Sequence, residues 1–283
     1  MDKKEIKTNP FKEGDVHVTS VGLGGEGVLR TTGYYTKAAE VILEAERQGV
    51  TYFDSARAYS DSELYYGSVW QKYPEKRIRI FQASKSASRD RDGALSDLSR
   101  TLQRMQTDFL DLWQIHDVRT EEDLETISKP GGALEAFIEA KSSGRVRYIG
   151  VTGHHDPRIL TVAVRDWPVD TVMMPVNPVE GLLGGFLTST LPAAKEKGMA
   201  VIGMKVLGAS HYVRPELGIT SEMLIRYALS FGITVAIVGC STPEEVNTLA
   251  DVGRLKEPMR DREKARINDI FSPYVHRLAF YRG

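Results

Sequence analysis

Three ionisable residues, Asp54, Lys85 and His116, stand at the ends of three consecutive strand-like runs of the sequence. A buried strand that ends on a charge is unusual, because an isolated buried charge is costly. Asp54 and Lys85 can balance each other, which would keep the lysine ionised. Tyr59 follows Asp54 by five residues, and an ammonium beside its phenol would lower the phenol pKa from ~10.

Together these residue types suit the reduction of a carbonyl group. A phenol of lowered pKa can donate a proton to a developing alkoxide near neutral pH, and His116 can donate a hydrogen bond to the same oxygen. No side chain can supply hydride, so this chemistry would require a nicotinamide cofactor. Tyr65 and Tyr66 lie on the helical pattern that follows, and we expect them to pack rather than to react.

The elements that must position these side chains are short apolar runs, each followed by a segment of helical periodicity. The runs cover residues 18–24, 52–55, 78–85, 110–116, 148–154, 171–177, 200–206 and 235–240. Nearly continuous apolar runs are typical of strands buried on both faces. Eight strand–helix units in 283 residues predict an α/β fold, a (β/α)8 TIM barrel over roughly residues 18–255.

We expect two additions to this barrel, within a single domain that spans residues 1–283. The residues before Val18 could form a short hairpin that closes the bottom of the barrel. Residues 257–283 form a helical extension, with a helix from Asp261 to Phe271. Chemistry in such barrels sits at the carboxyl ends of the strands, and the extension could cover that face.

The alternative architecture is a doubly wound open sheet, whose first strand leads into a glycine-rich phosphate loop and a helix. The stretch GLGGEG at residues 22–27 resembles that loop. About ten residues separate it from the helix expected near Tyr35, however, so its glycines do not begin a helix. We therefore interpret the stretch as a loop over the mouth of the barrel.

Composition excludes several classes of function. The formal net charge is -1 and no basic arm is present, so we expect no nucleic-acid partner. The single Cys240 allows no internal disulfide, which suits a reducing cytosol. The charged N-terminus lacks an apolar signal region, and no apolar run approaches the ~20 residues of a membrane span. We expect a cytoplasmic protein without membrane contact.

The motifs resemble those of the aldo-keto reductases. The stretch Asp54–Tyr59, DSARAY, is similar to the family's Asp-Thr-Ala-x-x-Tyr after the second strand, and QASKS contains Lys85 after the third. DFLDLWQIH, which ends on His116, and GRVRYIGVTG also match family motifs in order. By this resemblance Tyr59 is the general acid, Lys85 lowers its pKa, Asp54 holds Lys85, and His116 orients the substrate carbonyl.

The resemblance also implies a cofactor site, where this sequence departs from the family pattern. The usual Ser-Asn after the fifth strand is Thr152-Gly153, so His154 and Asn177 are candidates to replace the lost amide. The aromatic residue that stacks on nicotinamide is replaced by Met204. The expected cofactor-binding residues are Thr152, Gly153, Asn177, Met204, Lys205, Leu207, Gly239, Ser241, Thr242 and Glu245.

The cofactor expected from family habit is NADP, and NAD remains possible. Glu245 stands where many members carry an arginine for the 2′-phosphate, and a carboxylate would repel that group. Alternatively, Glu245 is occupied in a capping box after the N-cap Thr242 and Pro243. Lys205 could meet the pyrophosphate as a point charge, or it could be a solvated strand end.

Two other functions remain open for the same barrel. One is a non-catalytic sensor that binds nicotinamide and reports redox state to a partner protein. The other is a Schiff-base lyase that uses Lys85 or Lys205, although Asp54 argues against Lys85 in that role. We expect no metal, since His154 and His155 lack the three or four convergent ligands that a metal needs. The expected ligand is a small carbonyl compound, and the oligomeric state stays open.

Overall fold

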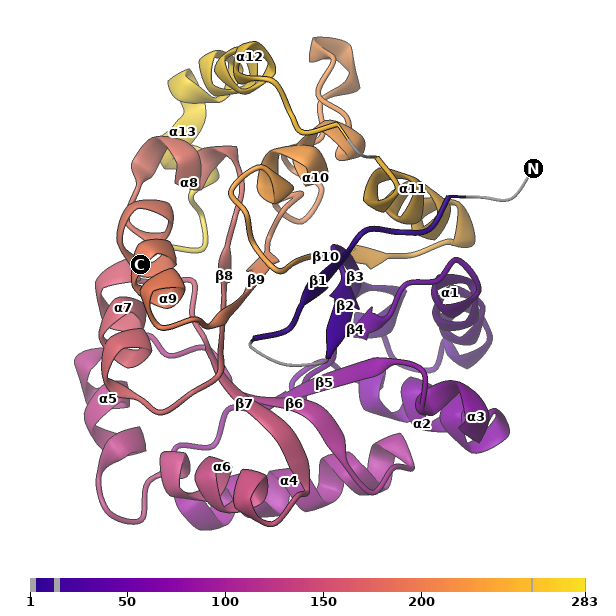
Figure 1. The fold of residues 1–283 in the computed structure, drawn as a ribbon, viewed down its shortest axis with the longest axis vertical. Coiled ribbons are helices and arrows are strands. Elements are labelled where there is room, and N and C mark those ends of the chain that lie inside the picture. Colours follow the sequence, from indigo (N-terminus) through magenta and orange to yellow (C-terminus); the bar gives the residue numbers. More distant parts are fainter. Residues whose placement is uncertain (1–3, 13–15, 256, 283) are drawn as a thin grey trace.

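Eight parallel strands close into a barrel that is surrounded by helices (Figure 1), as the sequence predicts. The computed structural model describes residues 4–12, 16–255 and 257–282. The barrel closes between its last and first strands, and each other strand pairs with the next along the chain. The strands are β3 (Val21–Gly27), β4 (Tyr52–Phe53), β5 (Phe81–Ser86), β6 (Leu110–Ile115), β7 (Val146–Thr152), β8 (Thr171–Pro175), β9 (Ala200–Met204) and β10 (Val235–Cys240).

The first barrel strand differs from the sequence prediction in two ways. Val18 belongs to a hairpin of β1 (Thr8–Pro10) and β2 (His17–Thr19), and the barrel strand begins only at Val21. The stretch 22–27 is part of that strand and not a loop. A Cβ atom on Gly24 would lie 2.9 Å from the backbone nitrogen of Gly239, so glycine allows the close approach of β3 and β10.

The helices lie between consecutive strands and beyond the last one. They are α1 (Tyr35–Arg47), α2 (Ser62–Lys72), α3 (Pro74–Arg77), α4 (Arg91–Met105), α5 (Glu121–Ser128), α6 (Ala133–Ser142), α7 (Pro157–Asp166), α8 (Pro178–Leu183), α9 (Leu191–Glu196), α10 (Ser221–Leu229), α11 (Pro243–Gly253), α12 (Asp261–Phe271) and α13 (Val275–Leu278). Short turns of other helix types are η1 (Val28–Arg30), η2 (Phe186–Thr190), η3 (Pro215–Leu217) and η4 (Ser272–Tyr274). The expected starts at Tyr35 and Asp261 are confirmed. No helix within the described ranges is long and apolar enough to cross a membrane.

Aromatic side chains fill the amino-terminal end of the barrel. Phe11, which follows β1, is fully buried, and its ring centroid lies 4.3 Å from that of Phe81 and 5.1 Å from that of Tyr148. Phe81 is the first residue of β5, so the hairpin region closes the strand starts. Burying one such ring stabilises the fold by roughly 1.5–3 kcal/mol.

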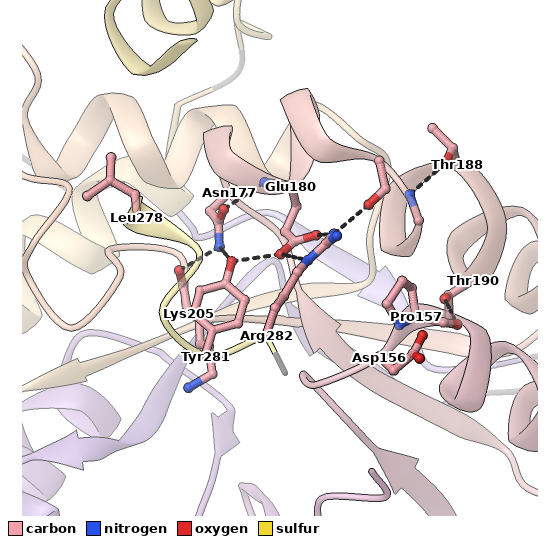
Figure 2. A network of polar contacts seen from close by, with 12 residues as sticks. Asp156, Pro157, Asn177, Glu180, Thr188, Thr190, Lys205, Leu278, Tyr281 and Arg282 are labelled. Atoms are coloured by element: carbon pink, nitrogen blue, oxygen red, sulfur yellow. Dashed lines mark hydrogen bonds and ion pairs between the residues drawn. The ribbon is translucent and has the colours of Figure 1, made fainter. Parts of the chain in front are cut away.

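The chain returns to the opposite end of the barrel after α12. The residues that follow α13 run beside α8 and reach the carboxyl ends of the strands (Figures 1 and 2). Tyr281 in this segment contacts His154 after β7 and Lys205 after β9. The last turn of the extension therefore lies at the carboxyl ends of the strands. That it covers an active site stays a prediction. That the whole chain forms one domain stays a prediction.

Candidate active site

Asp54 and Lys85 form a buried ion pair at the carboxyl end of the barrel. Lys85 Nζ donates to Asp54 Oδ2 at 2.6 Å and to the carbonyl of Ser55 at 2.8 Å, and both charged side chains are only 1% exposed. Burial alone lowers the pKa of Lys85, but Asp54 and Tyr59 raise it, and the net pKa lies above the usual lysine value. Lys85 is therefore an ammonium at neutral pH, as the sequence predicts.

Tyr59 lies between this pair and His116. Lys85 Nζ is 4.8 Å from the centroid of the phenol ring, and the imidazole centroid of His116 is 5.7 Å from it at a nearly perpendicular angle. The guanidinium of Arg30 lies 5.1 Å from the same centroid. A Cβ atom on Gly25 would come within 2.5 Å of the ring, so the backbone of β3 packs directly on Tyr59.

The pKa of Tyr59 differs from the sequence prediction. Burial raises the pKa of this phenol, Lys85 lowers it by a smaller amount, and the net pKa lies above the usual value. The charge of Asp54 raises the pKa of Tyr59, and so does the packing of Gly25 on its ring, which contributes to the burial. Both effects oppose that of the Lys85 ammonium. Tyr59 therefore holds its proton through the neutral range, which keeps it able to donate.

His116 is held as a neutral imidazole. Burial, and then the charge of Lys85, lower the pKa of His116 to about 3. Arg89 fixes the backbone around it, because its guanidinium donates to the carbonyls of His116 and Asp117 at 2.8 Å and to Asp123 at 2.8 Å. A neutral imidazole has one N–H to donate, so His116 can hydrogen-bond a carbonyl oxygen.

The two other tyrosines of this segment are packing residues, as expected. Tyr65 and Tyr66 are fully buried. The hydroxyl of Tyr65 donates to the carbonyl of Thr31 at 2.9 Å, and that of Tyr66 donates to the carbonyl of Asp54 at 3.2 Å. Tyr66 thus supports the backbone that carries the ion pair, which the helical pattern alone does not reveal.

The end of β7 is closely packed where the family carries an amide side chain. Thr152 Oγ1 accepts a hydrogen bond from the backbone of Asp117 at 2.8 Å. A Cβ atom on Gly153 would lie 3.0 Å from the carbonyl oxygen of Val118. His154 Nε2 lies 3.1 Å from Asp117 Oδ1, so His154 is directed at a carboxylate.

The residues at the ends of β8 and β9 differ in how many contacts their side chains make within the protein. Asn177 is fully buried, donates to the carbonyl of Lys205 at 3.1 Å and accepts from the backbone of Glu180 at 3.1 Å. Met204 is half-buried against the core inside the barrel. Leu207 packs against the core beneath the helices. A cofactor contact by Asn177 would have to replace one of its internal bonds.

The loop after β10 is closed by its own helix. Ser241 donates its backbone N–H to Glu245 Oε2 at 2.6 Å, and Thr242 Oγ1 accepts from the backbone of Glu245. The capping interaction that the sequence predicts is present, although the carboxylate takes the N–H of Ser241 rather than that of Thr242. Gly239 meets β3 closely, since a Cβ there would lie 2.5 Å from Glu26 Cβ. The carboxylate of Glu245 is thus occupied in capping.

Comparison with known proteins gives the family. The family described as "Aldo/keto reductase family" matches residues 20–218. The chain belongs to this family. Curated aldo/keto reductase relatives include "Aldo-keto reductase str7" of Strobilurus tenacellus, 26% identical over 70% of this chain and 60% of that protein. "L-galactose dehydrogenase" of Arabidopsis thaliana is 25% identical over 76% of this chain and 73% of that protein.

Solved aldo-keto reductases share the fold along nearly the whole chain. The holo form of AKR11C1 from Bacillus halodurans has a TM-score of 0.76 and 20% identity, covering 94% of this chain and 96% of that one. An aldo-keto reductase from Klebsiella pneumoniae in complex with NADPH has a TM-score of 0.73 and 20% identity, covering 94% and 95%. The matched parts span only 60% and 56% of the first two curated relatives, str7 and the oxidoreductase YqkF of Bacillus subtilis.

Three residues that contact the candidate site are not found by reasoning from the sequence. Gly25 lies in the stretch that the sequence predicts as a loop, and neither Arg89 nor Tyr281 is among the residues that it predicts for the site. A glycine inside a strand does signal close backbone approach, so Gly25 could have been found. The contacts of Arg89 and Tyr281 join segments far apart in the chain, and no local pattern reports them. The roles of the individual site residues stay predictions.

Proposed function

We propose that this chain reduces aldehydes or ketones with hydride from a nicotinamide cofactor, and that Tyr59 is the general acid. The observation that carries the proposal is the position of the Tyr59 ring between the Lys85 ammonium and the neutral His116. Aldo/keto reductase membership supports the reaction class. We infer a small carbonyl compound as the substrate and the cytoplasm as the location.

The residues present fit a nicotinamide dinucleotide at several points. Asp54 Oδ1 is buried and is not the oxygen that Lys85 contacts, so it can accept from a hydroxyl such as that of a ribose. Lys205 offers a cation, and Thr152 has a hydroxyl group. At the start of α11 the N–H groups of Ser241 and Glu245 are taken by the cap, so a phosphate bound there would have to displace the Glu245 carboxylate. NADP is proposed because the Klebsiella pneumoniae relative is complexed with NADPH, and NAD remains an alternative.

Four residues carry the proposed reaction: Asp54, Tyr59, Lys85 and His116. Each acts on the carbonyl oxygen of the substrate or on the group that donates a proton to it. The bound cofactor supplies hydride to the carbonyl carbon. His116 donates its N–H to the carbonyl oxygen and so fixes the orientation of the substrate. Tyr59 transfers its hydroxyl proton to the same oxygen as negative charge develops there.

Lys85 and Asp54 act on what remains after the proton has left. The Lys85 ammonium, beside the ring of Tyr59, stabilises the phenolate, which regains a proton from solvent. Asp54 keeps Lys85 charged in a buried place where an unpaired ammonium would be costly. Removing either partner is therefore expected to weaken the proton donor indirectly.

The test is NADPH oxidation with a panel of aldehydes and ketones, comparing wild type with Tyr59→Phe. We expect the variant to lose ~10²–10⁴-fold in kcat, the range typical of a positioned proton donor, while NADPH still binds. Tyr73→Phe, at a half-buried tyrosine between α2 and α3, is the control. Equal activity of wild type and Tyr59→Phe would contradict the role of Tyr59. Tight NADPH binding without turnover of any carbonyl would favour the sensor.

One observation favours the Schiff-base alternative at Lys205. Burial lowers the pKa of Lys205, and a lysine of lowered pKa is the better nucleophile. Lys85 is paired and its pKa is raised, which argues against it in this role. Borohydride trapping with carbonyl compounds, followed by peptide mapping, decides the matter. A missing adduct at Lys205 removes the alternative.

A further inference from the structure

The last residues of the chain are fastened to the carboxyl end of the barrel by four side chains, which we call the tail latch: Asn177, Glu180, Tyr281 and Arg282 (Figure 2). The Tyr281 hydroxyl donates to Glu180 Oε1 at 2.8 Å and accepts from Asn177 Nδ2 at 3.0 Å. Arg282 pairs with both carboxylate oxygens of Glu180. Its guanidinium also lies 5.2 Å from the ring centroid of Phe186.

Breaking the contacts of the tail latch costs free energy, because its one carboxylate, that of Glu180, is completely buried. Glu180 has no exposed surface, and burial raises the pKa of its carboxyl, while Arg282 and Tyr281 offset part of that effect. If the tail left, Glu180 would lose Arg282 and the Tyr281 hydroxyl together. A buried carboxylate without partners is strongly unfavourable. Tyr281 and Arg282 are therefore the partners that make this buried charge tolerable, and their bonds to Glu180 tie the tail to α8.

Tyr281 contacts the ammonium of Lys205 directly and is connected to its backbone through Asn177. The ammonium of Lys205 lies 5.2 Å from the centroid of the Tyr281 ring, within reach of a cation–π attraction. The carbonyl of Lys205 accepts from Asn177 Nδ2, the same amide group that the Tyr281 hydroxyl accepts from. Lys205 has a left-handed backbone with a φ of 52°, a conformation that such a bond helps to hold.

Among the residues that the structure describes, no carboxylate pairs with the ammonium of Lys205. The carboxylates that act on it are those of Glu26 and Asp117. Glu26 pairs with Arg30 at 2.5 Å, and Asp117 pairs with Arg119 at 2.5 Å. Within the described part of the chain, Lys205 itself forms no ion pair. A half-buried cation held on an aromatic ring is ready to meet an anion.

We propose that Tyr281 is a positioning residue of the cofactor site, whose ring and hydroxyl hold Lys205 where its ammonium binds the diphosphate of the nicotinamide cofactor. This inference rests on the proposed function for the identity of the ligand. The seventh strand carries Met204 where the family places a stacking aromatic residue, and the tail brings an aromatic ring to the adjoining residue. The C-terminal residues are thus part of the site and not a passive cover.

The experiment is a fluorescence titration of NADPH into wild type, Tyr281→Ala, Lys205→Ala and the double variant. We expect each single variant to raise the NADPH Kd by about tenfold, the factor given by a partly desolvated cation–π contact and a hydrogen bond. The double variant should match Lys205→Ala, because Tyr281 acts through Lys205. Tyr281→Phe keeps the ring and should lie in between. The loss should appear in the KM for NADPH more than in kcat.

Tyr274→Ala is the matched control, since Tyr274 belongs to the same extension and is 52% exposed. Thermal unfolding checks that the variants are folded. If Tyr281→Ala does not fold, Arg282→Lys is used instead, because it weakens the contacts of the tail latch less. The inference is overturned if Tyr281→Ala costs the same factor in the Lys205→Ala background as in wild type. A lower Kd would also overturn it, because the ring would then occupy room that the cofactor needs.

Binding of inorganic diphosphate separates this inference from the proposed function. Calorimetry should show that wild type binds diphosphate and that Tyr281→Ala and Lys205→Ala bind it about tenfold more weakly. If wild type binds diphosphate in this way but neither NADPH nor NADH, the proposed function fails while the positioning role of Tyr281 stands. If NADPH binds and diphosphate binding is the same in all variants, the positioning role fails alone.

Discussion

Replacing Lys85 by methionine should destabilise the protein by an amount that depends on pH. The change removes the only ion-pair partner of Asp54 within the described chain, and that carboxylate is 1% exposed. Methionine has a similar length, so the main loss is the charge. An uncompensated buried charge costs about 3–5 kcal/mol.

Protonation of Asp54 sets a ceiling on this cost. The carboxyl has a pKa of ~3.9 in the unfolded chain, and neutralising it costs about 1.36 kcal/mol for each pH unit above that value. The ceiling is therefore about 4 kcal/mol at pH 7 and about 1.5 kcal/mol at pH 5. In the variant the folded pKa of Asp54 is raised further, so the folded state binds the extra proton. At low pH, Asp54 is protonated and the variant unfolds with nearly the same free energy as wild type. As pH rises, the free energy of unfolding of the variant falls below that of wild type.

Urea unfolding of wild type and Lys85→Met at pH 5 and pH 7 measures this difference. Lys129→Met, at an exposed lysine after α5, is the control and should change stability by less than about 0.5 kcal/mol. Adding Asp54→Asn to Lys85→Met should recover most of the loss at pH 7, because no buried charge remains. If the loss is the same at both pH values, Asp54 does not become an unpaired buried carboxylate and the reasoning is wrong.

Three further predictions follow from the site and the core. The kcat/KM for reduction should show no inflection near the usual histidine pKa, because the pKa of His116 is about 3. It should fall only above the usual tyrosine pKa of ~10, because the pKa of Tyr59 is raised; rates from pH 5 to 11 check this. Gly67→Ala should cost about 1–3 kcal/mol in urea unfolding, because its Cβ would lie 2.0 Å from a backbone oxygen of α4; an unchanged midpoint contradicts this. Arg89→Met should lower kcat about tenfold by loosening His116 and Arg89→Lys should restore part of it, whereas equal loss in both argues against positioning.

Much of the fold could be predicted because its causes are local. Runs of apolar residues mark strands buried on both faces, and a helical period marks the segment that covers each of them. The eight strands and the helix of residues 261–271 are confirmed on this basis. The start of β3 was wrong because Val18 and Leu23 are equally apolar, and only pairing with β1 assigns Val18 to the hairpin.

Part of the site was also accessible from the sequence. The carboxyl ends of parallel strands meet at one end of a barrel, so Asp54, Lys85 and His116 had to lie near one another. The pKa of Tyr59 was not accessible. It is a balance between desolvation and the charge of Lys85, and the packing of Gly25 that desolvates the ring is a tertiary contact.

The sequence by itself determined which residue types stand at the carboxyl ends of the strands, since periodicity and motif order depend only on neighbours along the chain. Tertiary structure alone decided which of those side chains are already bonded within the protein and which can still bind a ligand. Asn177 is occupied because Tyr281, more than 100 residues later, accepts from its amide. Lys205 forms no ion pair within the described ranges, because Glu26 pairs with Arg30 and Asp117 with Arg119. The burial and the hydrogen bonds of each side chain depend on segments that are far apart in the sequence and meet only in the folded protein.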